Sequence, residues 1–349
     1  MIARSPLACF AALAILAIAS SARAADPDPD FYKGKQIRLI VTGGAGAVYD
    51  TYARILAEHL PKYIPGNPTI IVQNNPAASG IVATNFLYSA APRDGTVIVT
   101  ALSSIPTAPL FSPDAAKFDV TKFSWIGSIT SDPFVGYVWH TAPIRTYEEA
   151  KSVEATMGGN ALGGAGVDMV LLSNRFFGTK FKLITGYKDS VETKLAIERG
   201  EVDGTFANAW GDLKTTRYEW IKEGKVRVIV QHGLKKHREL PDVPLFMDQA
   251  KTAADRQALE AMLARQEFSK PYFTAPEVPA DRVALLRRAF DATLKDPEFL
   301  AAAAKARLDV DGPMTGEELA AMVAKVAATP SAVVERIQKV FEEFAAGAK

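Results

Sequence analysis

The sequence predicts an α/β protein made of two doubly wound α/β domains with a ligand cleft between them. Three observations predict this fold. Apolar strand-like runs alternate with helical patterns, the alternation pauses at Ser103–Ser124 and then resumes, and a glycine-rich loop follows a strand in each half. The length of 349 residues fits two domains. A hydrophobic content of 48% with 23% charged residues is typical of a globular protein.

The first half begins with a strand–helix–strand–helix–strand pattern. The strands are expected at Gln36–Val41, Thr69–Val72 and Thr96–Leu102, and the helices at Asp50–Leu60 and Ile81–Ala90. Short links between such elements predict a parallel sheet with right-handed crossovers.

The second half repeats the alternation. Its expected strands are Trp125–Ile129, Phe134–His140, Glu154–Met157, Phe181–Thr185, Val202–Ala207 and Val226–Val230. Its expected helices are Tyr147–Val153, Asp168–Phe177 and Ser190–Arg199, the last closed by Gly200.

The C-terminal third is predicted to be helical, at Asp281–Leu294, Pro297–Ala306, Thr315–Ala328 and Pro330–Ala346. These late helices have no sheet of their own to cover. We therefore expect a discontinuous first domain of residues 26–125 plus 246–349, and a second domain of residues 126–245.

The N-terminus has the three-part pattern of a secretory signal peptide over residues 1–24. Arg4 precedes the 13-residue apolar run Leu7–Ala19, and Ala22-Arg23-Ala24 gives a cleavage signal near Ala24-Ala25. The alternative is an uncleaved anchor, for which the run is short, because a span needs about 20 residues. Cleavage removes Cys9, the only cysteine, and leaves 38 Lys and Arg against 39 Asp and Glu. We expect an exported, soluble mature protein.

Several classes of function find no support in the sequence. The formal net charge of +1 does not suggest nucleic-acid binding. The sequence holds no C-x-x-C, H-E-x-x-H, phosphate-binding nucleotide loop or G-x-S-x-G motif, so we expect no metal site, no cofactor and no catalytic residues. Tyr49 stands at the third glycine of a dinucleotide fingerprint, which disfavours that cofactor. The segment HGLKKHR, with His232 and His237, is interpreted as a solvated surface.

Two glycine-rich loops carry the best candidate chemistry. Thr42–Asp50 and Gly158–Asp168 each follow a predicted strand and precede a helix. Ligands of open α/β sheets bind at this edge, where helix N-termini attract anions. Neither loop contains Lys or Arg, which favours a small carboxylate, held by backbone N–H groups and neutral side chains, over a polyphosphate. The alternative for each loop is a tight turn with no ligand.

The order of motifs resembles the periplasmic substrate-binding proteins of tripartite tricarboxylate transporters, the Bug family. The matching stretches are IRLIVTGGAGAVYDTYARILAEHL, IIVQNNPAASGIVATNFLYSAAPRDGTVI, KLITGYKDSVETKLAIERGEVDGTF, GKVRVIV, ELPDVP and PYFTAPEVPADRVALLRRAFDATLKDPEF. The resemblance covers essentially the whole mature chain. It implies a type II periplasmic-binding-protein fold and a monomeric periplasmic protein that captures a small organic carboxylate for membrane transporter subunits, without catalysis.

The resemblance also implies ligand-binding positions. These are Gly46, Ala47, Val48, Tyr49, Asp50, Ser79, Ser103, Ser104, Asn160, Gly163, Gly164, Ala165, Gly166, Asp168, Tyr187 and Asn208. The chain departs from the family by lacking the usual Ser or Thr in both glycine-rich loops, so a smaller, more aromatic or less charged ligand than a tricarboxylate is expected. Asp50 has two interpretations, a helix cap or a contact to a ligand hydroxyl or ammonium. Two alternatives to transport remain, a ligand-sensing receptor for a membrane signalling partner and an exported enzyme.

Overall fold

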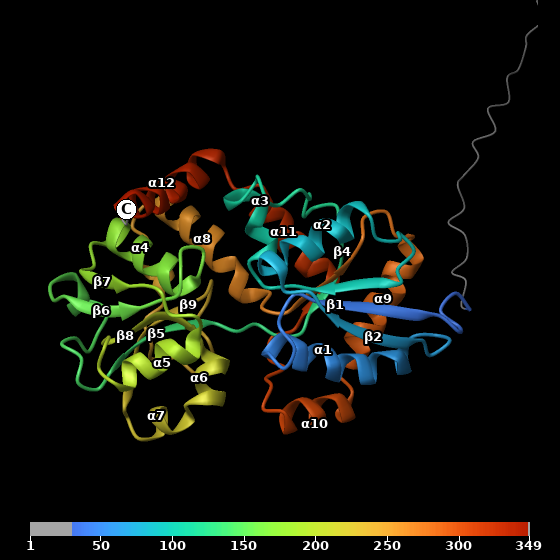
Figure 1. Ribbon diagram of the computed structural model, residues 1–349, viewed down its shortest axis with the longest axis horizontal. Helices are drawn as coiled ribbons and strands as arrows, with labels where there is room; N and C mark the ends of the chain where they lie inside the picture. Colours follow the sequence, from blue (N-terminus) through green and yellow to red (C-terminus); the bar gives the residue numbers. More distant parts are fainter. Residues whose placement is uncertain (1–29, 348–349) are drawn as a thin grey trace, which may run out of the picture.

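The computed structural model describes residues 30–347 and shows two lobes side by side, each built around its own β-sheet (Figure 1). The predicted two-domain α/β architecture is confirmed. The predicted signal peptide lies outside the described residues. Within residues 30–347, no helix combines the length and the apolar character needed to cross a membrane.

Lobe 1 contains a six-stranded sheet in the order β11-β4-β10-β3-β1-β2. The strands are β1 Gln36–Val41, β2 Thr69–Asn74, β3 Val97–Thr100, β4 Ser124–Ser128, β10 Pro271–Thr274 and β11 Met314–Thr315. Strand β1 pairs in parallel with both β2 and β3, as the alternating pattern predicts. Strand β10 then pairs antiparallel with β3 and β4, so the sheet is mixed.

The helices of lobe 1 come from both ends of the described chain. They are α1 Val48–His59, η1 Leu60–Tyr63, η2 Ala77–Gly80, α2 Ile81–Ser89, η3 Ile105–Thr107, α3 Ala108–Phe111, α9 Ala280–Thr293, α10 Pro297–Lys305 and α11 Gly316–Ala327. Helices α9 and α11 pack against β4, and α10 packs against α1. Two of the late helices, α9 and α11, therefore cover the first sheet, and α10 packs on its helix α1.

Lobe 2 contains a five-stranded sheet in the order β7-β6-β8-β5-β9. Its strands are β5 Phe134–Trp139, β6 Ala155–Gly158, β7 Phe181–Ile184, β8 Gly204–Ala209 and β9 Val226–His232. Its helices are η4 Glu149–Lys151, α4 Ala165–Phe177, α5 Ser190–Glu198, α6 Trp210–Thr216, α7 Tyr218–Lys222, η5 Phe246–Gln249, α8 Ala253–Glu267 and α12 Ser331–Gly347. The helix expected at Tyr147–Val153 is wrong beyond the single turn η4, where the Ala150 carbonyl accepts the Lys180 N–H at 2.7 Å instead of an N–H of a continuing helix.

Helices α8 and α12 come from the range 246–349 but pack in lobe 2. Val333 and Ile337 of α12 share a core with Met169 of α4 and Met262 of α8. Near its C-terminal end, α8 passes into the lobe 1 core through Ala264. Within residues 30–347, the chain crosses between the lobes at 129–133, 268–270 and 328–330. The end of α8 therefore lies at the boundary where a ligand cleft is expected.

Candidate functional site

The first glycine-rich loop is closed by an aspartate of the helix that follows it. Gly46 has a φ of +76°, a conformation that favours glycine, and its N–H donates to Asp50 Oδ2 at 2.7 Å. Arg54 Nε and Asn74 Nδ2 also donate to this carboxylate, at 2.9 and 3.0 Å. Burial alone would raise the pKa of Asp50, but these three hydrogen bonds hold that pKa below its ordinary value. The contacts fit the helix-cap interpretation of Asp50.

The second glycine-rich loop is closed in the same way. Gly163 has a φ of +89°, and its N–H donates to Asp168 Oδ1 at 2.9 Å. Asp168 Oδ2 lies 3.6 Å from Nη2 of Arg265, which comes from α8. Burial raises the pKa of Asp168 and outweighs the opposing effect of Arg265 and Gly163. The two loops thus share one device, an aspartate in the first turn of the helix that holds a glycine N–H.

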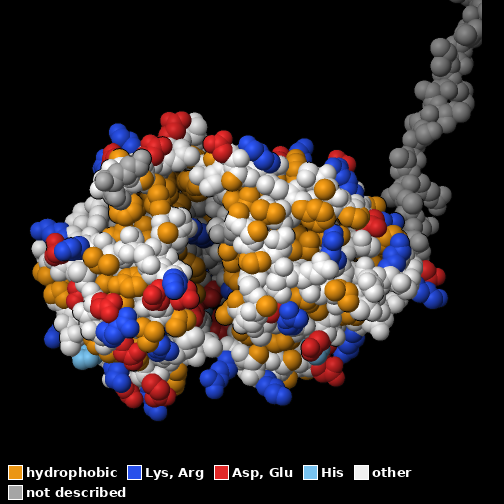
Figure 2. Space-filling view, in the orientation of Figure 1, with side chains coloured by type: hydrophobic (Ala, Val, Ile, Leu, Met, Phe, Trp, Pro, Cys, Tyr) orange, Lys and Arg blue, Asp and Glu red, His pale blue; other side chains and the backbone are white. Residues whose placement is uncertain are grey.

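The helices that begin at these loops both start at the edge of one space. The N-cap residues, Ala47 of α1 and Gly164 of α4, provide no side-chain hydrogen bond to the first turn. The first turn of a helix leaves N–H groups without intrahelical partners and carries a partial positive charge. Both helix N-termini border one cavity of about 460 Å³, which we call the hinge cavity. Figure 2 shows that the molecule is hollowed between its lobes.

The hinge cavity also contains a buried cation. Lys270 is 4% exposed, and its Nζ donates to Ser269 Oγ at 2.6 Å. The Nζ atom lies 3.8 Å from Asp132 Oδ2, and it lies 5.0 and 5.5 Å from the ring centroids of Tyr49 and Tyr52. Burial lowers the pKa of Lys270, against the opposing charge of Asp132. An incoming carboxylate would supply this ammonium with a further acceptor beside Ser269 Oγ.

Tyr49 connects the first loop to the chain segment that carries Lys270. Its hydroxyl donates to the Ser269 carbonyl at 2.5 Å and accepts from the Ser103 N–H at 3.2 Å. Burial raises the pKa of Tyr49 to about 12, so the phenol stays protonated. The hydroxyl has two protein partners, and the ring is the part of Tyr49 that faces Lys270.

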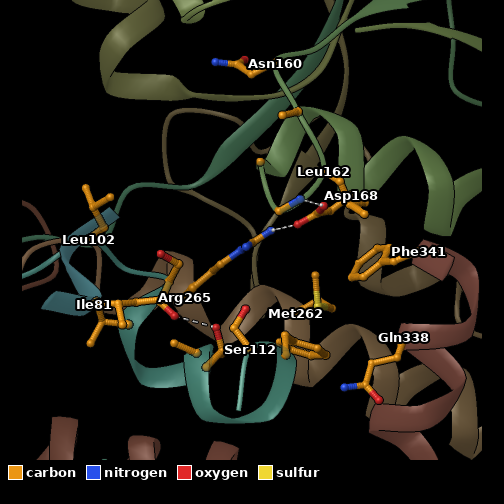
Figure 3. Close-up of a pocket in the computed structure, with 18 of the residues that line it drawn as sticks. Ile81, Leu102, Ser112, Asn160, Leu162, Asp168, Met262, Arg265, Gln338 and Phe341 are labelled. Carbon is orange, nitrogen blue, oxygen red and sulfur yellow. Dashed lines mark hydrogen bonds and ion pairs between the residues drawn. The ribbon is translucent and has the colours of Figure 1, made fainter. Parts of the chain in front are cut away.

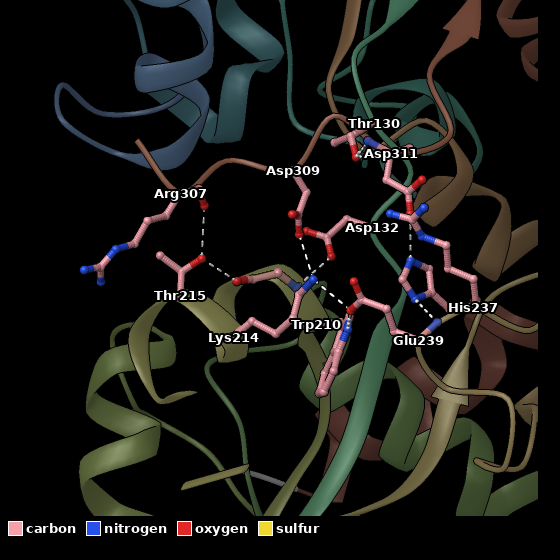
Figure 4. Close-up of polar contacts among 12 residues, drawn as sticks. Thr130, Asp132, Trp210, Lys214, Thr215, His237, Glu239, Arg307, Asp309 and Asp311 are labelled. Carbon is pink, nitrogen blue, oxygen red and sulfur yellow. Dashed lines mark hydrogen bonds and ion pairs between the residues drawn. The ribbon is translucent and has the colours of Figure 1, made fainter. Parts of the chain in front are cut away.

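A strap of residues 307–311, between α10 and β11, borders the hinge cavity on another side. Its carboxylates reach lobe 2, where Asp309 lies 2.9 Å from Lys214 Nζ and Asp311 lies 3.0 Å from Arg238 Nε (Figure 4). Asp311 also lies 3.3 Å from His237 Nε2. The expectation that His237 belongs to a solvated surface is wrong, because this strap covers it and leaves its side chain 11% exposed.

The same expectation is wrong for His232. This residue ends β9 and is fully buried, with Nε2 2.6 Å from the Phe206 carbonyl oxygen. Burial lowers its pKa to about 3. The segment HGLKKHR therefore begins in the core of lobe 2 at His232. Further along, its His237 is covered by the strap.

The structure divides the predicted site residues among three places. Those that line the hinge cavity are Val48, Tyr49, Ser103, Asn160, Gly164, Ala165, Gly166 and Asn208. A second cavity, of about 840 Å³, is lined by Ser104, Asn160, Gly163, Gly164 and Asp168. Outside both cavities lie Gly46, Ala47, Asp50 and Tyr187. Ser79 is in η2, and its side chain is not among the described parts.

Sequence reasoning did not find Lys270, Arg265 or Asp132. No element was assigned to residues 246–278, so the two cations had no predicted position. A signal was present, because Thr252 caps α8 by accepting from the Asp255 N–H at 3.0 Å, ahead of a run rich in Ala, Leu, Glu and Arg.

One acidic group in the described chain has the proximity needed for a metal ion. His59, Asp296 and Glu298 place ligand atoms within 4.8 Å of one another. However, Lys62 Nζ lies 3.0 Å from Asp296 and 3.4 Å from Glu298. This ammonium already supplies the positive charge there.

Comparison with known proteins gives a consistent result. The sequence model of a family described as "Tripartite tricarboxylate transporter family receptor" matches residues 52–338. A UPF0065 protein in the gbd 5'region of Cupriavidus necator is 26% identical over 245 residues, which is 68% of this chain and 71% of that protein. A UPF0065 protein of Bordetella bronchiseptica is 32% identical over 91 residues, 26% of each chain.

Solved structures show the same fold. A TctC solute binding protein from Polaromonas superposes with a TM-score of 0.68 at 19% identity, covering 87% of this chain and 99% of that one. A Rhodopseudomonas palustris protein with adipate gives 0.60 at 19% identity, covering 88% and 97%. MatC from the same organism, with bound malate, gives 0.59 at 18% identity, covering 88% and 98%.

Proposed function

The chain belongs to the tripartite tricarboxylate transporter receptor family, and on that basis we propose that it is a periplasmic solute-binding protein. It captures a small organic carboxylate in the hinge cavity and delivers it to membrane transporter subunits, without catalysis. It acts as a monomer after its signal peptide is removed. The adipate and malate named for two structural neighbours support a carboxylate as the class of ligand.

One observation carries this proposal. The hinge cavity brings together the N-terminus of α1, the N-terminus of α4 and the buried ammonium of Lys270. All three favour negative charge, and they come from different parts of the chain. A carboxylate between them is held by backbone N–H groups and by the ammonium of Lys270.

The same geometry gives a reason for the lobes to close on the ligand. Helix α1 belongs to lobe 1 and α4 to lobe 2, so one carboxylate contacts both only when the lobes are close together. A ligand that binds the closed state more tightly shifts the population toward it. We expect α12 to move with lobe 2, because it packs on α4 and α8.

Titration calorimetry with malate, adipate and citrate tests the proposal on the mature protein. Lys270→Met removes the buried charge while keeping the length of the side chain. It should weaken binding of the preferred acid about tenfold or more, since charge-assisted hydrogen bonds contribute about 1.5–3 kcal/mol. Unfolding should be little affected, because the buried charge is costly in the empty cavity.

Lys182→Met is the matched control, because Lys182 is exposed on the edge strand β7. It removes the same charge from the protein without changing the cavity. Equal losses of affinity in both variants would mean that only net charge matters. Binding of all three acids that is unchanged by Lys270→Met would refute the role of the hinge cavity.

A further inference from the structure

The second cavity has the features of a further ligand site beside the hinge cavity. Its volume is about 840 Å³, and it lies between α3 and the end of β3 in lobe 1 and α4, α8 and α12 of lobe 2 (Figure 3). Its apolar walls are formed by Ile81, Leu102, Ile105, Phe111, Leu162, Met262 and Phe341. We call it the apolar cavity.

A single buried cation extends into the apolar cavity. Arg265 is 7% exposed and points from α8 toward Asp168 (Figure 3). Among the described residues, its Nε and Nη2 atoms have no hydrogen-bond partner. The 3.6 Å separation from Asp168 is an ion pair rather than a hydrogen bond. Buried donors without acceptors are costly, so this guanidinium has capacity for another group.

Asp168 does not use up that capacity. One of its oxygens accepts the Gly163 N–H, and the other faces Arg265. A guanidinium carries five N–H donors on a planar fork, and a second carboxylate can occupy part of it. Arg265 is thus able to keep its pair with Asp168 and to hold an acceptor from a ligand.

From these observations we infer that the apolar cavity binds a monocarboxylate with an apolar body, its carboxylate on Arg265. The apolar walls favour an aliphatic or aromatic body, and each buried methylene adds to the affinity. A di- or tricarboxylate would bring further charges into a cavity whose described lining offers no second cation and includes Glu342, so its additional carboxylates would be poorly compensated. The apolar cavity shares Asn160 and Gly164 with the hinge cavity, but its cation is Arg265, whereas the cation of the hinge cavity is Lys270.

Calorimetric titration with octanoate, hexanoate and butyrate tests the inference. Affinity should rise with chain length, by about fourfold for each methylene that is fully buried. Arg265→Lys keeps a positive charge beside Asp168 but loses the planar fork, and it should weaken octanoate binding at least tenfold. The double variant Arg265→Met/Asp168→Asn removes both charges together and should give the same loss if Arg265→Lys folds poorly.

A wall variant gives a second readout. Leu162 is 41% exposed, so Leu162→Asp should fold normally and repel the carboxylate, while Leu162→Asn is the uncharged control. Octanoate should bind Leu162→Asn at least fivefold more tightly than Leu162→Asp. Lys270→Met should still bind octanoate, whereas it loses the small acids of the hinge cavity.

Three results would overturn the inference. The first is no octanoate binding at millimolar concentration, and the second is affinity that does not depend on chain length. The third is loss of octanoate binding in Lys270→Met together with retention in Arg265→Lys, which would place the acid in the hinge cavity. Malate, adipate and citrate are titrated separately from octanoate. A failure of the proposed function can therefore be distinguished from a failure of this inference.

Discussion

The Tyr49 hydroxyl donates a 2.5 Å hydrogen bond to the Ser269 carbonyl oxygen, joining residues 220 positions apart. This bond connects the first turn of α1 to the segment 268–270 that passes between the lobes. It places the Tyr49 ring beside Lys270 Nζ, at 5.0 Å from the ring centroid. The shape of the hinge cavity therefore depends on a contact between the first turn of α1 and the segment that leads into β10.

Tyr49→Phe should destabilise the protein, because it leaves the Ser269 carbonyl and the Ser103 N–H without this partner. The expected loss is about 1–3 kcal/mol in the free energy of unfolding, measured by urea denaturation. Tyr218→Phe is the control, since Tyr218 is 58% exposed. Equal stability of both variants would show that the hydroxyl contributes nothing to the lobe boundary.

Asp50→Asn distinguishes the two interpretations of this residue. The amide would direct a donor at either the Gly46 N–H or Asn74 Nδ2, so the ligand-free protein should lose about 1–2 kcal/mol of stability. Affinity for the hinge-cavity ligand should stay within about twofold, because Asp50 lies outside both cavities.

The pH dependence of stability gives a further check on Asp50. Its pKa is lowered in the folded state, so its contribution is present above the ordinary pKa of an aspartate and is lost as the pH falls through the folded value. Asp50→Asn should reduce that acid sensitivity, and Asp242→Asn on the exposed surface should not. A large loss of ligand affinity with unchanged stability would favour the ligand-contact interpretation instead.

Local sequence patterns were sufficient to predict the elements around the two glycine-rich loops. Strand β1, its loop and α1 follow one another within a short segment, so their spacing alone indicates a strand, a turn and a helix. Eight of the predicted site residues line the hinge cavity, and they lie on segments of this kind. Parallel strands bring such loops to one edge of each sheet, which makes their proximity within each lobe predictable.

Helix α8 shows why other parts of the site could not be predicted. It lies between the lobes, with Leu259 and Met262 in one core and Ala264 in the other, so it lacks one apolar stripe. Its end carries Arg265, and Lys270 follows five residues later. Their burial depends on contacts with Asp168 and Tyr49, which lie about 100 and 220 residues away in the sequence. Local sequence patterns cannot predict contacts between residues so far apart.

The strap of residues 307–311 should stabilise the arrangement of the lobes seen here. Its backbone is held by lobe 1, where the Tyr52 hydroxyl donates to the Asp309 carbonyl at 2.7 Å, while its carboxylates pair with Lys214 and Arg238 of lobe 2. Asp309→Asn/Asp311→Asn removes both pairs. Because exposed pairs contribute up to about 1 kcal/mol each, ligand affinity should fall about two- to fivefold.

Small-angle X-ray scattering on the ligand-free protein measures the same effect directly. The double variant should have a larger radius of gyration than the parent protein. In the parent, 0.5 M salt should produce part of that increase by screening the ion pairs, since the Debye length shortens to a few ångströms near about 1 M. Identical scattering and affinity in the variant and the parent would mean that the strap does not bias the lobes.

His232 should make the protein sensitive to acid. Its folded pKa of about 3 lies below the ordinary value of 6.5, so the folded state favours the neutral ring and the unfolded chain binds a proton first. Its contribution to stability is therefore full above pH 6.5 and falls by about 1.4 kcal/mol for each pH unit between 6.5 and 3.

His232→Gln keeps a donor for the Phe206 carbonyl and removes this titration. Urea denaturation across this pH range should show a shallower decline for His232→Gln, while the exposed His140→Gln should follow the parent. Parallel curves for the parent and His232→Gln would show that the buried ring does not control acid unfolding.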